Sequence, residues 1–352
     1  MLAAFLAQNS PSYFAPWQRL CKKHTFALFV IYFYMKSRHV FILITAFLMV
    51  MLIAFPEKYI TSVANGLNLY ALNVLPALFP FMFFSKVLGE LNFGYDLGKA
   101  MNKPINKLYN VSGIGGYVLV MSMLSGYPVG AKVLADLYDK KQISTSEAKS
   151  ISTFTSSSGP LFIVGTVGIV MLGNKLAGFI ILISHYLGTI LNGFVYNFKK
   201  KKTLSPQLFP PLFDSSKVMQ DSITSSILSV LIVGGYIAIF NMALDIITDF
   251  GIIKLFVKLF SFTKIDYNLN TGFFSSFVEI TKGCLIMSKS GVSINLIVPC
   301  CTFAITFGGL SVTLQSMTFL AKCKIKPAFY LLSKLTQALI SMIIAIPLSL
   351  IL

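Results

Sequence analysis

Long apolar runs alternate with short polar breaks along almost the whole chain. Several runs reach or approach the roughly 20 apolar residues that a helix needs to cross a bilayer. They fall at residues 40–55, 69–85, 112–126, 158–172, 176–198, 223–244, 294–320 and 328–352. Some of them are too short or too interrupted for one straight helix. The pattern predicts an all-α polytopic membrane protein with about eight to ten membrane-embedded segments.

Composition supports this fold class. Hydrophobic residues make up 55% of the chain, charged residues make up 12%, and the mean hydropathy is +0.77. The formal net charge of +17 could suggest nucleic acid, but Lys and Arg are spread over short loops. The positive-inside rule accounts for such loops, with residues 199–202 and 322–326, Lys36 and Arg38 on the cytoplasmic side. We therefore expect the lipid bilayer, and no nucleic acid, as a partner.

The first 34 residues differ from the rest. They mix basic and aromatic residues with one short apolar run, and they lack the small-residue cleavage site of a signal peptide. Met35 then opens a basic flank that leads directly into an apolar segment. We interpret residues 1–34 as a doubtful extension with the start at Met35, and residues 35–352 as a single membrane domain.

Two stretches of this domain follow a similar order. Residues 112–172 run as an apolar segment, a Gly/Pro break (SGYPVG), a charged amphipathic piece and a Ser-rich segment broken at SSSGP. Residues 273–320 give an apolar lead, a charged break (TKGCLIMSKSG) and a long apolar segment broken at TFGGLS. Helix candidates at 69–91 and 223–247 precede them. The sequence predicts two related halves, at about 60–198 and 215–352, each with broken or re-entrant helices.

Breaks inside apolar segments carry physical information. In hydrocarbon every backbone polar group must be satisfied internally, so unwound backbone occurs only inside protein or along a hydrated cavity. Matched breaks in two halves therefore indicate an enclosed site near the midplane, as in secondary transporters. The alternative is that Ser and Gly only let helices pack closely.

The candidate substrate-binding residues lie at and after these breaks. Ser hydroxyls could donate hydrogen bonds, Gly permits close approach, and the positive ends of half-helices favour an anionic group. Intramembrane ionisable residues usually face a cavity or a partner. The predicted set is Ser125, Gly126, Lys132, Ser156, Ser157, Ser158, Gly159, Glu279, Lys282, Gly308 and Gly309.

Simpler roles compete for some ionisable residues. Lys132 and Asp136 stand one helical turn apart, so a mutual ion pair is the main alternative for Lys132. Lys86 and Glu90 have the same spacing, and we expect a structural pair there. His185 stands alone in an apolar segment, where a hydrogen-bonded core histidine is the simpler interpretation.

Motifs for catalysis and cofactors are missing. The five Cys show no metal-ligand spacing, and no phosphate loop, H-E-x-x-H or G-x-S-x-G occurs. We expect no enzymatic activity, no cofactor and no metal site.

Four sequence elements carry a family resemblance. LNVLPALFPFMFFSKVLGEL (72–91), LSGYPVGAKVLADLY (124–138), SSSGPLFIVGTVG (156–168) and VEITKG (278–283) resemble the YlbJ-type sporulation integral membrane proteins. The resemblance covers essentially residues 35–352. That family carries the nucleoside-recognition or Gate domain, similar to the core of concentrative nucleoside transporters and to the membrane part of ferrous-iron transporters. No GTPase domain accompanies it here, which argues against the iron branch.

The resemblance also implies a function. It implies movement of dipicolinic acid, a small dianion, across the outer forespore membrane of a sporulating bacterium. By analogy with the nucleoside carriers it places hairpin tips at 125–130 and 279–283, and broken helices at 156–160 and 306–311. We expect alternating access at a midplane site, and a homo-oligomer is compatible with the sequence. The alternatives are a non-transporting membrane factor for spore-envelope or cortex assembly, and a nucleoside carrier.

Overall fold

The computed structural model describes residues 39–91, 93–199, 215–259 and 266–352. These residues form helices joined by short turns, and none of them lies in a β-strand. The predicted extension at residues 1–34 lies outside the described residues. The all-α polytopic fold class is confirmed.

The chain divides into two compact units, Met1–Tyr59 and Ile60–Leu352. The described part of the first unit contains a helix at His39–Ala54. Its apolar side chains, such as Phe41 and Ile53, are largely exposed. An exposed apolar helix surface of this kind is typical of lipid contact.

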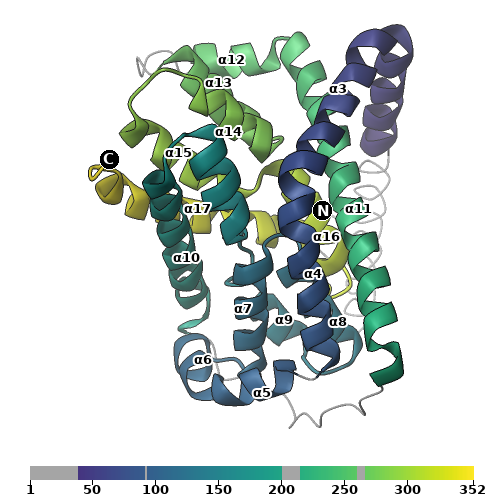
Figure 1. Ribbon diagram of the computed structural model, residues 1–352, viewed down its shortest axis with the longest axis vertical. Coiled ribbons are helices and arrows are strands. Elements are labelled where there is room, and N and C mark those ends of the chain that lie inside the picture. Colours follow the sequence, from purple (N-terminus) through teal and green to yellow (C-terminus); the bar gives the residue numbers. More distant parts are fainter. Residues whose placement is uncertain (1–38, 92, 200–214, 260–265) are drawn as a thin grey trace, which may run out of the picture. The chain divides into compact units, whose positions relative to one another are not determined.

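The second unit begins within α3 (Pro56–Leu69), and two stretches of it share one order of elements (Figure 1). Each has a long helix, short amphipathic helices, a helical hairpin, a broken helix and a final long helix. In the first stretch these are η1 (Tyr70–Val74) with α4 (Leu75–Glu90), α5 (Phe93–Ala100), α6 (Asn102–Tyr109), α7 (Ile114–Ser125), α8 (Val129–Asp139), α9 (Thr145–Ile151), the π-helix η2 (Leu161–Met171) and α10 (Lys175–Asn197). In the second they are α11 (Ser215–Asp249), α12 (Ile252–Leu259), α13 (Tyr267–Ser276), α14 (Ile280–Ser288), α15 (Ile294–Phe307), α16 (Gly309–Leu320) and α17 (Pro327–Ser349).

Within the part of the chain that the structure describes, four spans are long and apolar enough to cross a membrane: Lys175–Asn197, Val218–Asp249, Ile294–Leu320 and Pro327–Ser349. The number rises to six among the described residues if each bent helix pair is one span. One such pair, Asn102–Tyr109 with Ile114–Ser125, bends by 91°. Of the shorter apolar runs, residues 112–126 form the hairpin arm α7 and residues 158–172 form the half-helix η2, because Gly, Pro and Ser interrupt them.

The interior of the second unit contains many small polar residues between the helices. α17 packs against α10 and α15, and α4 packs against α11 (Figure 1). One buried apolar cluster surrounds α7, α8 and α9, and another joins η2, α10, α14 and α15. Each hairpin therefore has its own apolar support, and the polar breaks lie between these clusters.

Candidate functional site

The first hairpin ends in a tight turn at residues 125–128, named here tip 1. Gly126 ends α7 with φ 79° and ψ −172°, a backbone conformation essentially limited to glycine. A Cβ on Gly126 would lie 2.5 Å from the backbone nitrogen of Gly159. Tip 1 therefore packs backbone against backbone on the break that follows in the chain.

That break, residues 155–159, is non-helical as expected and is named break 1. The Ser122 Oγ of α7 lies 3.0 Å from the Ser157 Oγ and donates to the Thr155 carbonyl at 2.6 Å. The Ser156 Oγ lies 2.6 Å from the Tyr330 hydroxyl. Of the three predicted serines in break 1, Ser156 and Ser157 thus form hydrogen bonds through their hydroxyls to other side chains. These bonds hold the unwound segment in place.

The second hairpin turns at residues 277–279, named tip 2. Glu279 caps α14, because its carboxylate accepts hydrogen bonds from the Lys282 backbone N–H at 2.7 Å and the Thr281 hydroxyl at 3.1 Å. The Lys282 side chain does not bond to Glu279 but forms an ion pair with Asp245 of α11. The expected tip at 279–283 therefore begins two residues earlier.

Break 2 separates α15 from α16 at Gly308, which adopts a left-handed conformation with φ 84°. The Leu310 and Ser311 backbone N–H groups donate to the Phe277 and Val278 carbonyls at 2.8 and 3.1 Å. A Cβ on Gly309 would lie 2.5 Å from the Ser276 carbonyl oxygen. Tip 2 thus packs on break 2 much as tip 1 packs on break 1.

Both tips and both breaks meet at one cavity of about 70 Å³, named the central cavity. The helices η2, α14 and α16 begin beside it, so their positive dipole ends converge there. Among the described residues that line it, Glu279 is the single charged one. The lining residues from these four sites are Ser125, Gly126, Tyr127, Ser158, Gly159, Leu161, Phe162, Glu279, Ile280, Thr281, Ser311, Val312 and Gln315.

His185 of α10 connects the two breaks. Its Nε2 accepts the Ser158 backbone N–H at 2.9 Å, and its Nδ1 lies 2.8 Å from the Thr306 Oγ1. Because a backbone N–H can only donate, Nε2 carries no proton and Nδ1–H donates to Thr306. The histidine is buried and fully hydrogen-bonded, as the simpler interpretation of the sequence expected.

Tyr127 and Lys334 form a second connection, which the sequence analysis missed. The Tyr127 hydroxyl donates to the Ile305 and Thr306 carbonyls, at 3.1 and 3.2 Å. The same oxygen accepts a hydrogen bond of 2.9 Å from Lys334 Nζ. Lys334 is the single charged residue in the apolar run 328–352, and that isolation was the signal in the sequence.

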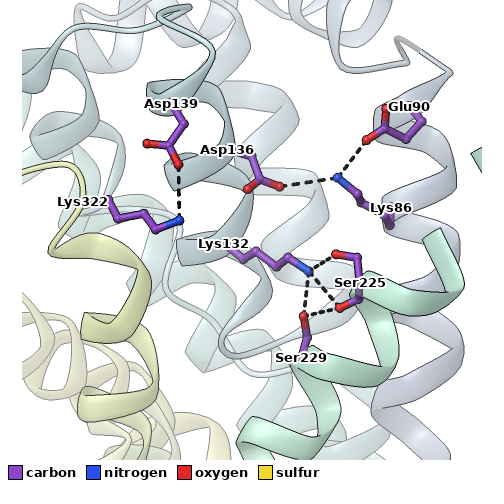
Figure 2. Close-up of polar contacts among 8 residues, drawn as sticks. All are labelled: Lys86, Glu90, Lys132, Asp136, Asp139, Ser225, Ser229 and Lys322. Atoms are coloured by element: carbon purple, nitrogen blue, oxygen red, sulfur yellow. Dashed lines mark hydrogen bonds and ion pairs between the residues drawn. The ribbon is translucent and has the colours of Figure 1, made fainter. Parts of the chain in front are cut away.

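Lys132 lies away from the central cavity, in a second cavity of about 90 Å³ between α4 and α8, named the charged cavity (Figure 2). Its Nζ donates to the hydroxyls of Ser225 and Ser229 of α11, at 2.6 Å each. The alternative of a Lys132–Asp136 pair is wrong, because Asp136 instead lies 3.8 Å from Lys86 Nζ.

Lys86 Nζ also pairs with Glu90 at 2.8 Å, so the expected structural pair is confirmed. Figure 2 further shows Lys322 reaching Asp139 of α8, at 3.3 Å. The first hairpin is therefore tied to its surroundings by charged side chains that do not line the central cavity.

The predicted site residues thus fall into two groups. The central cavity is lined by Ser125, Gly126, Ser158, Gly159 and Glu279. The others support it or lie elsewhere: Ser156, Ser157, Gly308 and Gly309 shape the breaks, and the side chains of Lys132 and Lys282 bind α11. Within the described ranges, no group of three or more His, Cys, Asp or Glu could hold a metal ion.

Comparison with known proteins gives one informative relative. No family model matches the chain, and no solved structure matches it. The sporulation integral membrane protein YlbJ of Bacillus subtilis (strain 168) is 30% identical over 323 residues, which cover 83% of this chain and 78% of the relative. Together with the apolar spans, this identity shows that the chain is an integral membrane protein belonging to the YlbJ family of sporulation proteins.

Proposed function

We propose that this protein transports a small organic anion, dipicolinate, across the outer forespore membrane during sporulation. The observation that carries the proposal is the central cavity, where two hairpin tips and two helix breaks converge. Sites of this construction recur at the midplane of secondary transporters. The family membership supports the sporulation context.

The chemistry of the cavity favours an anion on one side. The N-terminus of η2 borders it beside break 1, and tip 1 and break 1 contribute no acidic side chain. Helix N-termini attract carboxylates through their dipoles and their backbone N–H groups. The Ser125 and Ser158 hydroxyls border the same side. Two carboxylates on a planar ring can therefore be held mainly by backbone groups.

The size of the cavity supports a mechanism with moving parts. About 70 Å³ is several times the space that one water molecule requires, but it is small for a ring with two carboxylates. Binding therefore requires a tip to move from its break. Such movement of one bundle against the other around a fixed site is the usual form of alternating access.

Dipicolinate flux into proteoliposomes tests this function. Leu161 lies at the start of η2, lines the cavity and is 49% exposed, so Trp at this position fits without overpacking and narrows the cavity. Ile169 lies on the same helix, is also 49% exposed and does not line the cavity. We expect L161W to reduce flux at least about tenfold (about 1.4 kcal/mol), and I169W to change it less than about twofold.

The other outcomes distinguish the alternatives. Absence of flux under every ion gradient, with normal folding of the protein, would contradict transport and favour a membrane factor for envelope assembly. Flux of uridine that dipicolinate does not inhibit would favour a nucleoside carrier. Equal loss of flux in L161W and I169W would contradict a role of the central cavity in transport.

A further inference from the structure

Lys334 places a buried amine close behind one wall of the central cavity. It lies in the N-terminal half of the span α17 and is 1% exposed. Its Nζ contacts Tyr127, a residue that lines the cavity, and lies 4.7 Å from the centroid of the Tyr127 ring. It also donates to the Ser156 carbonyl of break 1 at 3.1 Å. One side chain therefore separates this amine from the cavity.

The hydrogen bonds of Lys334 fit an ammonium group. Nζ has three partners: the Tyr127 hydroxyl oxygen, the Ser156 carbonyl and the Gln337 Oε1 at 3.3 Å. The Tyr127 hydroxyl donates its proton to backbone carbonyls of α15. The Gln337 amide N–H groups donate to the Ser156 carbonyl and the Thr189 hydroxyl. All three partners thus act as acceptors. Three acceptors match the three donors of an ammonium group, whereas a neutral amine has two.

No carboxylate compensates this charge within the described part of the chain. The carboxylates of Glu90, Asp136, Asp245 and Asp139 pair with Lys86, Lys282 or Lys322, and not with Lys334. The central cavity's own acid, Glu279, bonds to Lys282 N and Thr281 rather than to Lys334. A buried charge without a counter-charge is costly in a membrane protein, and such residues usually serve a solute or an ion.

We infer that Lys334 is the fixed positive charge that makes the central cavity prefer anions, and that it acts across Tyr127 without touching the solute. This inference rests on the proposed function and adds the basis of its selectivity. Coulomb attraction persists over several ångströms when little water intervenes, and it scales with the charge of the solute. Lys334 must therefore favour a dianion over a monoanion, and a monoanion over a neutral molecule of similar shape.

The test is binding of three pyridines to purified protein in nanodiscs at low salt. Dipicolinate carries two negative charges, picolinate carries one, and pyridine-2,6-dicarboxamide carries none. In Lys334→Met we expect Kd to rise about tenfold for dipicolinate and about threefold for picolinate, with less than twofold change for the diamide. A merely structural residue would weaken all three to the same extent.

Two further variants complete the test. Lys334→Arg keeps the charge, so it should keep the ratio of the dipicolinate and picolinate affinities even if both fall. Lys149→Met is the matched control, because Lys149 also lies over an aromatic ring, Phe329 at 4.3 Å, but is exposed on α9. An unchanged affinity ratio in folded Lys334→Met would overturn this inference while leaving transport intact. If the unsubstituted protein bound neither acid, the proposed substrate would fail, and this inference with it.

Discussion

The two walls of the central cavity are built alike but differ in charge. Wall 1, tip 1 with break 1, presents the start of η2 without an acidic side chain, and Lys334 lies behind it. Wall 2, tip 2 with break 2, carries Glu279 at the start of α14, and its Leu310 and Ser311 N–H groups donate to tip carbonyls. An acidic side chain therefore offsets the positive helix ends at wall 2, and wall 1 has none.

A shared order of elements therefore does not imply shared chemistry. The start of η2 lies at wall 1 with no acidic side chain beside it, whereas Glu279 stands at the start of α14 at wall 2. We expect the carboxylates of the proposed anionic solute at wall 1.

Gly126→Ala should disrupt wall 1 most strongly. The new Cβ would lie 2.5 Å from Gly159 N, and φ 79° with ψ −172° disfavours any side chain, so we expect a loss of about 3 kcal/mol or more in the free energy of unfolding. Flux should be lost as well. Gly251→Ala is the control, because Gly251 has φ 73° with open space around it. Thermal unfolding in detergent measures the stability of the two variants. A similar loss of stability in both would mean that backbone strain, not contact with break 1, explains the effect.

Glu279→Gln should make wall 2 resemble wall 1. Removing the negative charge from the cavity should tighten dipicolinate binding about threefold to tenfold, at a stability cost of about 1 kcal/mol for the weaker helix cap. Glu147→Gln serves as the control, because Glu147 is also buried and accepts the Ser112 backbone N–H at 2.9 Å, but does not line the cavity. Titration calorimetry gives the affinities. Weaker binding in Glu279→Gln would show that the carboxylate contacts the solute favourably.

Lys132→Met should have the smallest effect on binding. Its Nζ bonds to Ser225 and Ser229 in the charged cavity, so we expect dipicolinate Kd to change less than about twofold, and stability to fall by about 1 kcal/mol. The same calorimetric and thermal measurements apply. A tenfold loss of affinity would restore Lys132 to the binding site that the sequence predicted and move the site toward the charged cavity.

The sequence predicted the breaks better than the directions of side chains. The SGYPVG and SSSGP elements located tip 1 and break 1, because Gly and Pro in an apolar segment have few structural explanations. Helical spacing could not decide between Asp136 and Ser225 as the partner of Lys132, since α11 is distant in sequence. Lys334 was overlooked because it stands in the last apolar run without a break beside it, although its isolation was visible.

Sites made of main-chain groups have a consequence for genetics. The dipole end at wall 1 belongs to the backbone of η2, so replacing one side chain leaves it in place. A saturation screen for lost function should therefore score most strongly at glycines such as Gly126 and Gly309, which no larger residue can replace without moving a tip. Relatives could exchange most lining side chains and still conserve the backbone of the tips and breaks.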